Sequence, residues 1–238
     1  MPTAPPLPDA GVGAASPPIP GATVVPLRDG PAGLEVLLVE RAAAIAYGGM
    51  WAFPGGRVED TDAHPQHPDD EIERARRAAV REAEEEVGLA FPPDALVPFS
   101  HWTGGANPSR RYAAWYFLAP DPGGTVVPDG HETLRHRWIP PGEAVTCHQR
   151  GEIAVVAPTW VTLRTLADAP TVADALVLAT QRRPVVYLSR VVVHGEQRVV
   201  LWEGDAGYHA GDPALPGPRH RLVMDQAGWR YEHPDVTG

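Results

Sequence analysis

Residues 73–89 read ERARRAAVREAEEEVGL, and this stretch decides the fold class of the chain. At about 100° per residue, Ala79 and Ala83 fall on one apolar stripe, which indicates a helix packed against a core. Asp70 is a suitable capping residue before this helix, and Gly88 is a natural C-terminal stop. The sequence therefore predicts an amphipathic helix that runs from Asp70 to the residue before Gly88.

Three carboxylates share one side of this helix. Glu82, Glu85 and Glu86 fall within an arc of about 100°, beside the apolar stripe, whereas Glu84 points away. Like charges at these spacings repel each other, and the negative end of the helix dipole disfavours them further. A hard divalent cation such as Mg²⁺ would relieve this repulsion. On the residues alone, a solvated acidic surface remains the alternative.

The flanking sequence suggests three parts. Residues 1–20 are rich in Pro, Ala and Gly, which predicts a disordered leader. Residues 21–181 should form the main domain, and residues 182–238 a small β-rich C-terminal extension. Within the main domain we expect, besides the acidic helix, strands at 23–27, 34–40, 111–119 and 135–139 and helices at 141–147, 159–167 and 172–180. The extension should contain hairpins at 185–202 and 222–232.

Composition excludes several kinds of protein. The 20 basic residues are all arginines, which excludes a P-loop or Schiff-base lysine. The net charge of −10 argues against binding to nucleic acid. The single cysteine, Cys147, excludes an intrachain disulfide. No apolar run is long enough to cross a membrane, and no secretory signal begins the chain, so we expect a cytoplasmic protein.

The acidic segment resembles the signature of the Nudix hydrolase family, G-x5-E-x7-R-E-U-x-E-E-x-G-U, where U is aliphatic. The second half matches from Glu73 through residues 81–89, which read REAEEEVGL. The lead-in at residues 51–56, WAFPGG, is also similar to the family's. Sixteen residues separate Gly56 from Glu73 instead of five, which we interpret as an eleven-residue insertion before the helix. The looser resemblance extends from about Ala22 to Ala167.

The resemblance implies a fold and a reaction. The expected fold is an α/β/α sandwich with a central mixed β-sheet. The expected reaction is metal-dependent cleavage of the diphosphate linkage in a nucleoside diphosphate joined to a moiety X. The alternative is a Nudix-like module that binds a nucleotide without cleaving it, although such modules usually lose the carboxylates that this chain retains.

The resemblance also implies roles for individual residues. Glu85 and Glu86 would hold Mg²⁺ or Mn²⁺, with Glu82 as a further ligand or base. The Gly56 carbonyl would be a backbone ligand. Arg81 would pair with Glu73 and so fix the loop against the helix. A downstream carboxylate would approach the metal, and Glu132 is the best match for it. A surface-loop acid is the alternative for Glu132.

Several residues are assigned to the substrate side. Residues 101–119 resemble the branch of the family that acts on CoA and acyl-CoA, and Arg110 and Arg111 there are expected to bind phosphate. Gly104, Ala113 and Ala114 depart from that branch. Arg41 lies in a segment similar to a CoA-associated motif, and Gly55 is placed beside the substrate.

Two questions stay open at this level. The inserted loop carries His64 and His67 with Asp60 and Asp62, which we interpret as an ordinary polar loop rather than a second metal site. The C-terminal extension is expected to pack on the main domain, to cover the pocket or to form a homodimer contact.

Overall fold

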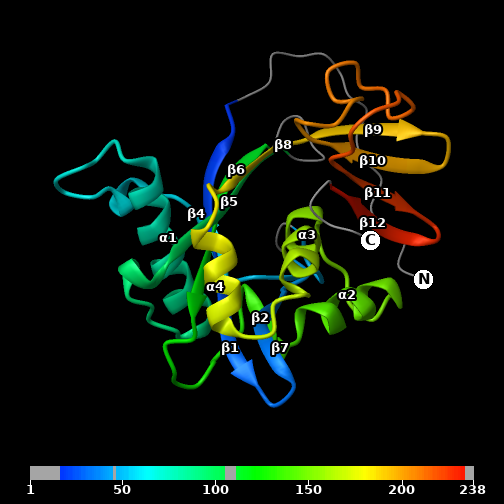
Figure 1. The fold of residues 1–238 in the computed structure, drawn as a ribbon. Helices are drawn as coiled ribbons and strands as arrows, with labels where there is room; N and C mark the ends of the chain where they lie inside the picture. Colours follow the sequence, from blue (N-terminus) through cyan, green and yellow to red (C-terminus); the bar gives the residue numbers. More distant parts are fainter. Residues whose placement is uncertain (1–16, 45–46, 105–110, 234–238) are drawn as a thin grey trace. The chain divides into compact units, whose positions relative to one another are not determined.

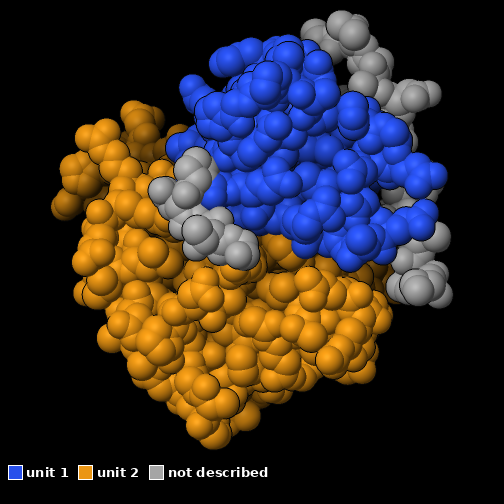
Figure 2. Space-filling model, turned by 45° about the vertical axis from the view of Figure 1, so that its right-hand side comes forward, with its two compact units in different colours: residues 1–19, 102–113, 186–238 blue, residues 20–101, 114–185 orange. Residues whose placement is uncertain are grey.

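The computed structural model describes residues 17–44, 47–104 and 111–233. The chain divides into two compact units, which Figure 2 shows in different colours. The larger unit comprises residues 20–101 and 114–185, and the smaller unit comprises residues 1–19, 102–113 and 186–238. We describe each unit by itself.

A mixed sheet with the order β3-β2-β1-β6-β5-β8 forms the scaffold of the described chain, with β4 also paired to β1 and β7 to β2. The antiparallel β1–β4 pairing sets Ala22 opposite Gly56 and Thr23 opposite Gly55. The strands of this sheet are β1 (Ile19–Gly30), β2 (Gly33–Arg41), β3 (Trp51–Ala52), β4 (Gly55–Arg57), β5 (Val97–Gly104), β6 (Tyr112–Pro120), β7 (Thr133–Ile139) and β8 (Val185–Leu188).

Helices cover both faces of the sheet in the larger unit. Figure 1 shows α1 on one side of the strands and α2 with α3 on the other. The helices are α1 (Glu71–Val87), α2 (Pro141–Gln149), α3 (Ala157–Leu166) and α4 (Val172–Thr180), with short 3-10 turns η1 (Asp60–Asp62) and η2 (Pro93–Ala95). The expected α/β/α sandwich is therefore confirmed. None of the helices in the described residues has the length and apolarity of a membrane span.

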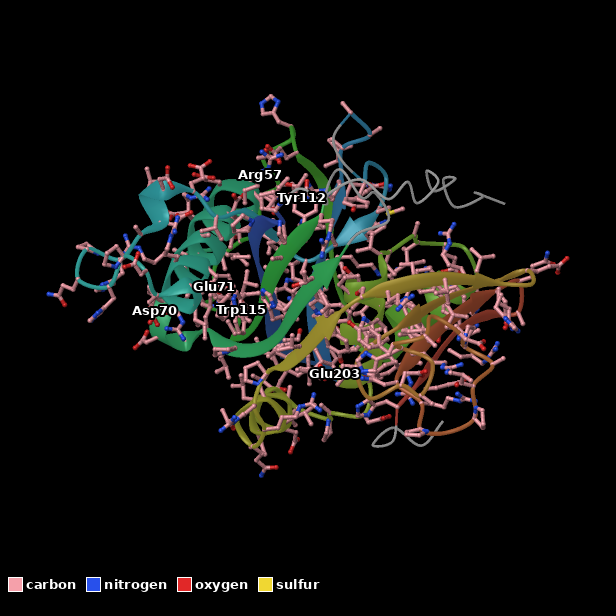
Figure 3. All side chains as sticks on the ribbon, turned by 90° about the horizontal axis from the view of Figure 1, so that it is seen from above. Arg57, Asp70, Glu71, Tyr112, Trp115 and Glu203 are labelled. Carbon is pink, nitrogen blue, oxygen red and sulfur yellow. The ribbon has the colours of Figure 1, made fainter. Side chains whose placement is uncertain are left out.

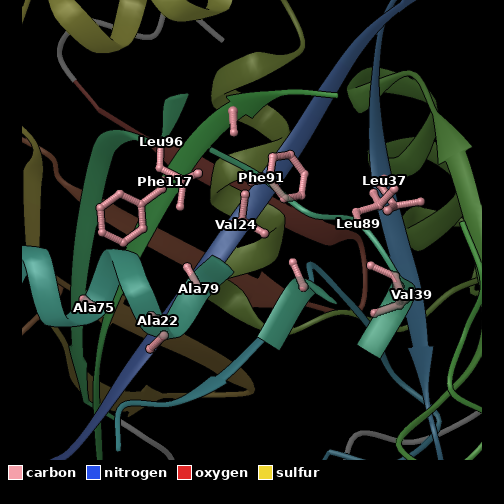
Figure 4. Packing of buried hydrophobic residues seen from close by; sticks show 14 residues of the cluster. Ala22, Val24, Leu37, Val39, Ala75, Ala79, Leu89, Phe91, Leu96 and Phe117 are labelled. Atoms are coloured by element: carbon pink, nitrogen blue, oxygen red, sulfur yellow. The ribbon is translucent and has the colours of Figure 1, made fainter. Parts of the chain in front are cut away.

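The core of the larger unit lies between α1 and the sheet (Figure 4). Small side chains let the helix approach the strands closely, and larger ones on the strands fill the remaining space. The helix contributes Ala75, Ala78, Ala79, Ala83 and Val87, and the sheet contributes Ala22, Val24, Leu37, Val39, Phe117 and Ala119, all buried. This packing fixes the face of α1 that carries the acidic side chains.

Both ends of α1 are capped as its sequence predicts. The Asp70 carboxylate accepts hydrogen bonds from the backbone N–H groups of Ile72 and Glu73, each at 3.1 Å. Gly88 adopts φ 71°, a left-handed conformation that glycine accommodates easily, and ends the helix. The first turn is also anchored to β6, because the Trp115 indole N–H donates to Glu71 at 2.9 Å (Figure 3).

The smaller unit contains a separate antiparallel sheet of the order β12-β11-β10-β9. Its strands are β9 (Arg190–His194), β10 (Gln197–Leu201), β11 (Arg221–Asp225) and β12 (Gly228–Glu232). Trp102 and Tyr187 stack with ring centroids 3.7 Å apart, and Trp202 packs edge-on against both. The expected β-rich C-terminal part is thus present.

Three boundaries differ from the sequence-based expectation. β1 begins at Ile19, inside the predicted leader, whereas residues 1–16 lie outside the described residues. The continuous strand expected at 185–193 is divided at Ser189, because β8 pairs with β5 in the first sheet and β9 pairs with β10 in the second. Residues 102–113, which the sequence pattern assigns to the main domain, group with the C-terminal segment.

Candidate active site

The C-terminal half of α1 carries the acidic side chains, and they differ in environment. Glu86 is buried and Glu82 is half-buried, whereas the side chain of Glu85 is 60% exposed. This difference follows from the helical period, because Glu82 and Glu86 are one turn apart on the side nearest β4. Glu82 and Glu86 therefore form the inner part of the site.

Glu86 has the most deeply buried of the three carboxylates on this side of α1. The Gly55 N–H donates to its Oε2 at 2.9 Å, while Oε1 is buried and has no hydrogen-bond partner among the described residues. Arg41 is its cationic neighbour, with Nη1 3.7 Å from Oε1. Burial raises the pKa of Glu86 to about 7, against the opposing effects of Gly55 and Arg41. An oxygen with a free lone pair thus lies inside the protein, next to other acids.

Glu82 lies directly over Gly56 in β4. A Cβ atom added to Gly56 would lie 2.4 Å from the Glu82 carboxyl carbon, so only glycine leaves room for this carboxylate. Burial raises the pKa of Glu82, and the negative charges of Glu85 and Glu132 raise it further, against the effect of Arg81. The close approach explains why a glycine is needed at this position of β4.

Gly56→Ala should therefore disturb function more than stability. The added methyl group displaces the flexible Glu82 carboxylate, and we expect turnover to fall by roughly 10- to 100-fold. The free energy of unfolding should change by less than about 1 kcal/mol, because no buried backbone has to move. Steady-state kinetics and thermal unfolding measure the two effects.

Gly142→Ala in α2 is the matched control, because its Cβ would meet Ala167 at an ordinary contact of 3.8 Å. Equal turnover in the two glycine variants would contradict the proposed position of Glu82.

Arg81 connects the helix to the loop that precedes it. Its guanidinium makes a two-pronged pair with Asp62, at 3.1 Å from Nε and 3.0 Å from Nη2. It also donates to Glu82 and Glu85, each at 3.0 Å, and to the Arg57 carbonyl at 3.0 Å. The Asp62 hydrogen bond and the neighbouring acids raise the pKa of Arg81, so it stays charged.

The expected pair of Arg81 and Glu73 is replaced by two other pairs. Glu73 bonds to Arg76 on its own helix, and Asp62 takes the place opposite Arg81. The reason is geometric, since Arg81 follows Glu73 by eight positions, which is about 12 Å along a helix. Asp62 follows Gly56 after five intervening residues, which is the spacing of the signature's first glutamate. The insertion therefore lies after this acid, not before it.

Asp62 is the site residue that sequence reasoning misses. The pattern of the inserted segment predicts a polar loop, yet the Asp62 side chain is buried and also accepts the Glu59 N–H at 2.8 Å. The five-residue spacing from Gly56 is the signal that could identify it. An aspartate where the signature has a glutamate obscures that signal.

The loop before β7 brings Glu132 to the same region. Its side chain is exposed, and its negative charge contributes to the raised pKa of both Glu82 and Glu86. Its carbonyl accepts the Ala42 N–H at 2.8 Å, next to Arg41 at the end of β2. The structure thus brings Glu132 and Arg41 to the acidic end of α1, as a shared site requires.

The other residues expected to bind substrate do not all lie near the acidic side chains in the described structure. Gly55 contacts Glu86 through its N–H, as described above. Arg111 belongs to the smaller unit, where its carbonyl accepts the Ile19 N–H at 2.8 Å. Arg110 lies outside the described residues. The structure therefore does not test the expected phosphate contacts of this arginine pair.

The carboxylate oxygens of this site suit a hard cation that takes only some of its ligands from the protein. Among the described residues, no three His, Cys, Asp or Glu side chains converge into a complete metal cage. Mg²⁺ characteristically binds through one or two carboxylates together with water and substrate phosphates, rather than in an all-protein cage. The free oxygen of Glu86 and the adjacent Glu82 fit that mode of binding.

Comparison with known proteins places this site in a family. The NUDIX domain model matches residues 17–158. The CTP pyrophosphohydrolase of Escherichia coli (strain K12) is 34% identical over 118 residues, which are 50% of this chain and 73% of that protein. The crystal structure of a NUDIX hydrolase from Alicyclobacillus acidocaldarius has the same fold, with a TM-score of 0.59 and 24% identity over 68% of this chain and 97% of that one.

The fold and the acidic helix define a phosphoanhydride hydrolase of α/β/α architecture. The chain belongs to the NUDIX domain family. It is accordingly a Nudix-type hydrolase that cleaves diphosphate bonds, and enzymes of this family generally use divalent metal ions.

Proposed function

We propose that the enzyme hydrolyses the phosphoanhydride bond of a nucleoside diphosphate joined to a moiety X, with Mg²⁺ or Mn²⁺ bound at the acidic end of α1. The observation that carries this proposal is the buried Oε1 of Glu86, which has no hydrogen-bond partner in the described chain and faces the charges of Glu82 and Glu132. Arg41 lies 3.7 Å from this oxygen without a hydrogen bond to it, and one arginine faces several acids here, so a further cation would compensate the remaining negative charge.

Each residue of the site has a distinct task in this proposal. Glu86 and Glu82 hold the cation, Glu85 is a further ligand at the exposed edge, and the Gly56 carbonyl remains a candidate backbone ligand. When bound, the metal lowers the pKa of water and neutralises phosphate charge. Glu132 is proposed to orient the attacking water or accept its proton. Arg81 keeps the carboxylates in place, since it donates to both Glu82 and Glu85.

Arg41 is proposed to bind a substrate phosphate. Its guanidinium Nη1 lies 3.7 Å from Oε1 of Glu86, and its side chain is 19% exposed. A guanidinium matches phosphate geometry through paired hydrogen bonds. A partly exposed arginine beside the proposed metal ligands is therefore well placed for the diphosphate. We retain Arg110 and Arg111 as proposed phosphate-binding residues on the basis of the sequence.

Two substrate classes are supported by different observations. The 34% identity to a CTP pyrophosphohydrolase supports a nucleoside triphosphate, in which X is phosphate. The segment around Arg111 supports CoA or acyl-CoA, but Gly104, Ala113 and Ala114 depart from that branch. We favour a nucleoside triphosphate, because the relative matches over much of its length.

A substrate panel tests the proposed function. The compounds are CTP and other nucleoside triphosphates, CoA, acyl-CoA, NADH, ADP-ribose and dinucleoside polyphosphates, each with Mg²⁺, with Mn²⁺ and with EDTA. We expect a mononucleotide and diphosphate from CTP with either metal and no turnover in EDTA. Full activity in EDTA, or no hydrolysis of any compound, would overturn the proposal. A dominant 3′,5′-ADP product would identify CoA as the substrate instead.

Three broader expectations remain proposals. We propose a cytoplasmic location, as the sequence predicts. The proposed domain limits at residues 20 and 181 can be examined by limited proteolysis. A homodimer contact through residues 182–238 can be tested by sedimentation equilibrium of the whole chain.

A further inference from the structure

The loop of residues 127–133 caps the acidic end of α1. The last carbonyl groups of a helix have no partner within the helix and must bond elsewhere. Here the Val127 N–H donates to the Val87 carbonyl at 2.9 Å, and the Asp129 N–H donates to the Glu86 carbonyl at 3.0 Å. The Thr133 hydroxyl, fully buried, donates to the same Glu86 carbonyl at 2.7 Å. The loop is thus bonded to the backbone of Glu86 itself.

The Asp129 carboxylate shapes the same loop from within. Its Oδ1 accepts the N–H groups of His131, Glu132 and Thr133, at 3.2, 3.1 and 2.8 Å, and the Thr133 hydroxyl lies 3.0 Å from it. These bonds outweigh the effect of partial burial and lower the pKa of Asp129, so it remains an ionised acceptor. One side chain therefore fixes the backbone on both sides of Glu132.

Glu132 is consequently held from two directions. Its N–H bonds to Asp129, and its carbonyl accepts the Ala42 N–H at 2.8 Å. Its side chain itself is exposed, so packing does not fix the position of the carboxylate. The position of Glu132 therefore depends on its backbone contacts. The neighbouring Thr133 bonds to the Glu86 carbonyl and so connects this backbone to the helix that bears Glu82 and Glu86.

We propose that Asp129 and Thr133 are positioning residues, which form a latch that sets the place of Glu132 relative to the carboxylates of α1. This inference rests on the proposed function of Glu132 in hydrolysis. Thr133 acts through the Glu86 carbonyl, and Asp129 acts through the backbone of residues 131–133. Neither is required to touch substrate or metal.

The kinetic test uses the full chain with Mg²⁺ and CTP, or the panel compound turned over fastest if CTP is inert. Thr133→Val keeps the branched shape and removes the hydroxyl, and we expect kcat to fall about 10-fold with KM changed less than about twofold. Thr133→Ser restores the hydroxyl and should recover most of the loss. Thr125→Val, at an exposed site before the loop, is the matched control and should retain wild-type activity.

A double-mutant cycle separates positioning from general destabilisation. Glu132→Gln alone should lower kcat by about 100-fold, in the range of a lost general base. If the effect of Thr133 on turnover lies in the position of Glu132, adding Thr133→Val to Glu132→Gln should cost little more. Independent, multiplicative losses would overturn the proposal, as would wild-type kinetics in Thr133→Val or failure of Thr133→Ser to recover activity.

Amide hydrogen exchange tests the latch independently of catalysis. In metal-free protein, Thr133→Val should accelerate exchange in residues 129–133, while the α1 residues before the last turn keep wild-type protection. Unchanged exchange would overturn the latch even if the enzyme hydrolyses CTP. If no panel compound is hydrolysed but exchange accelerates, the proposed function fails while the latch itself is supported.

Discussion

Replacing Glu86 with Gln should lower kcat on the order of 10³-fold while the protein remains folded. The amide has the size of the carboxyl group and can still accept the Gly55 N–H that now lies 2.9 Å from Oε2. It carries no negative charge and is a poor ligand for a hard cation. The loss should therefore appear in turnover and in Mn²⁺ affinity together, measured by steady-state kinetics and isothermal titration.

The effect of Glu86→Gln on the free energy of unfolding follows from the raised pKa of Glu86. Burial raises the pKa of Glu86 to about 7, so the metal-free folded protein binds a proton that the unfolded chain has released. The wild-type free energy of unfolding therefore decreases as pH rises from about 4.5 to 7, and the loss is complete above that pH. Glu86→Gln removes this cost, so the variant should be as stable as the wild type, or more stable, at pH 8 in EDTA.

Glu84→Gln is the matched control for Glu86→Gln. Glu84 is exposed on the same turn and should tolerate the change with wild-type turnover and metal affinity. Near-normal turnover of Glu86→Gln, or a comparable loss in Glu84→Gln, would show that metal chemistry does not depend on the inner carboxylate.

Asp62→Ala should lower both the stability of the larger unit and its turnover. It leaves Arg81 without its two-pronged partner and the Glu59 N–H without its acceptor. Removing one member of a buried ion pair costs about 3 kcal/mol, and Arg81 then becomes free to draw Glu82 and Glu85 out of place. We expect a decrease of that size in the free energy of unfolding and a roughly 10- to 100-fold loss of kcat.

Two neighbouring acids serve as controls for Asp62→Ala. Asp60 lies in the same 3-10 turn with a fully exposed carboxylate, and Glu73 is the acid that the signature spacing suggests as the partner of Arg81. Alanine at either position should cost less than about 1 kcal/mol, as is usual for exposed or same-helix pairs. A larger effect at Glu73 than at Asp62, in urea unfolding and kinetics, would favour Glu73 as the partner of Arg81 after all.

The fold was predictable where local pattern and packing agree. α1 begins after Asp70 and ends before Gly88, as its apolar stripe and its capping residues predict. β5, in contrast, was not predicted, since Val97–Gly104 lacks a regular alternation and contains a proline. β3 and β4 are two and three residues long and exist only because longer strands pair with them. Short elements of this kind carry too little local signal.

The acidic residues of the site were predictable from the sequence, but the burial and the hydrogen-bond partners of each one were not. The helical period alone is enough to place Glu82, Glu85 and Glu86 on one side of α1. It does not show that Glu86 is buried against Gly55 while Glu85 is exposed and bound to Arg81. Burial depends on where β4 lies over the helix, which is a property of the sheet.

By itself the sequence determined the helix, its limits and the shared side of its carboxylates, because a 3.6-residue period depends only on neighbours along the chain. Only the tertiary structure decided that Asp62 pairs with Arg81 and that Thr133 bonds to the carbonyl of Glu86. Those partners are separated by 19 and 47 positions, and the distance between them depends on how loops close over the sheet. The physical reason is that an ion pair or hydrogen bond requires two groups to be close in space. For residues far apart in the sequence, their spacing along the chain does not show whether folding brings them together.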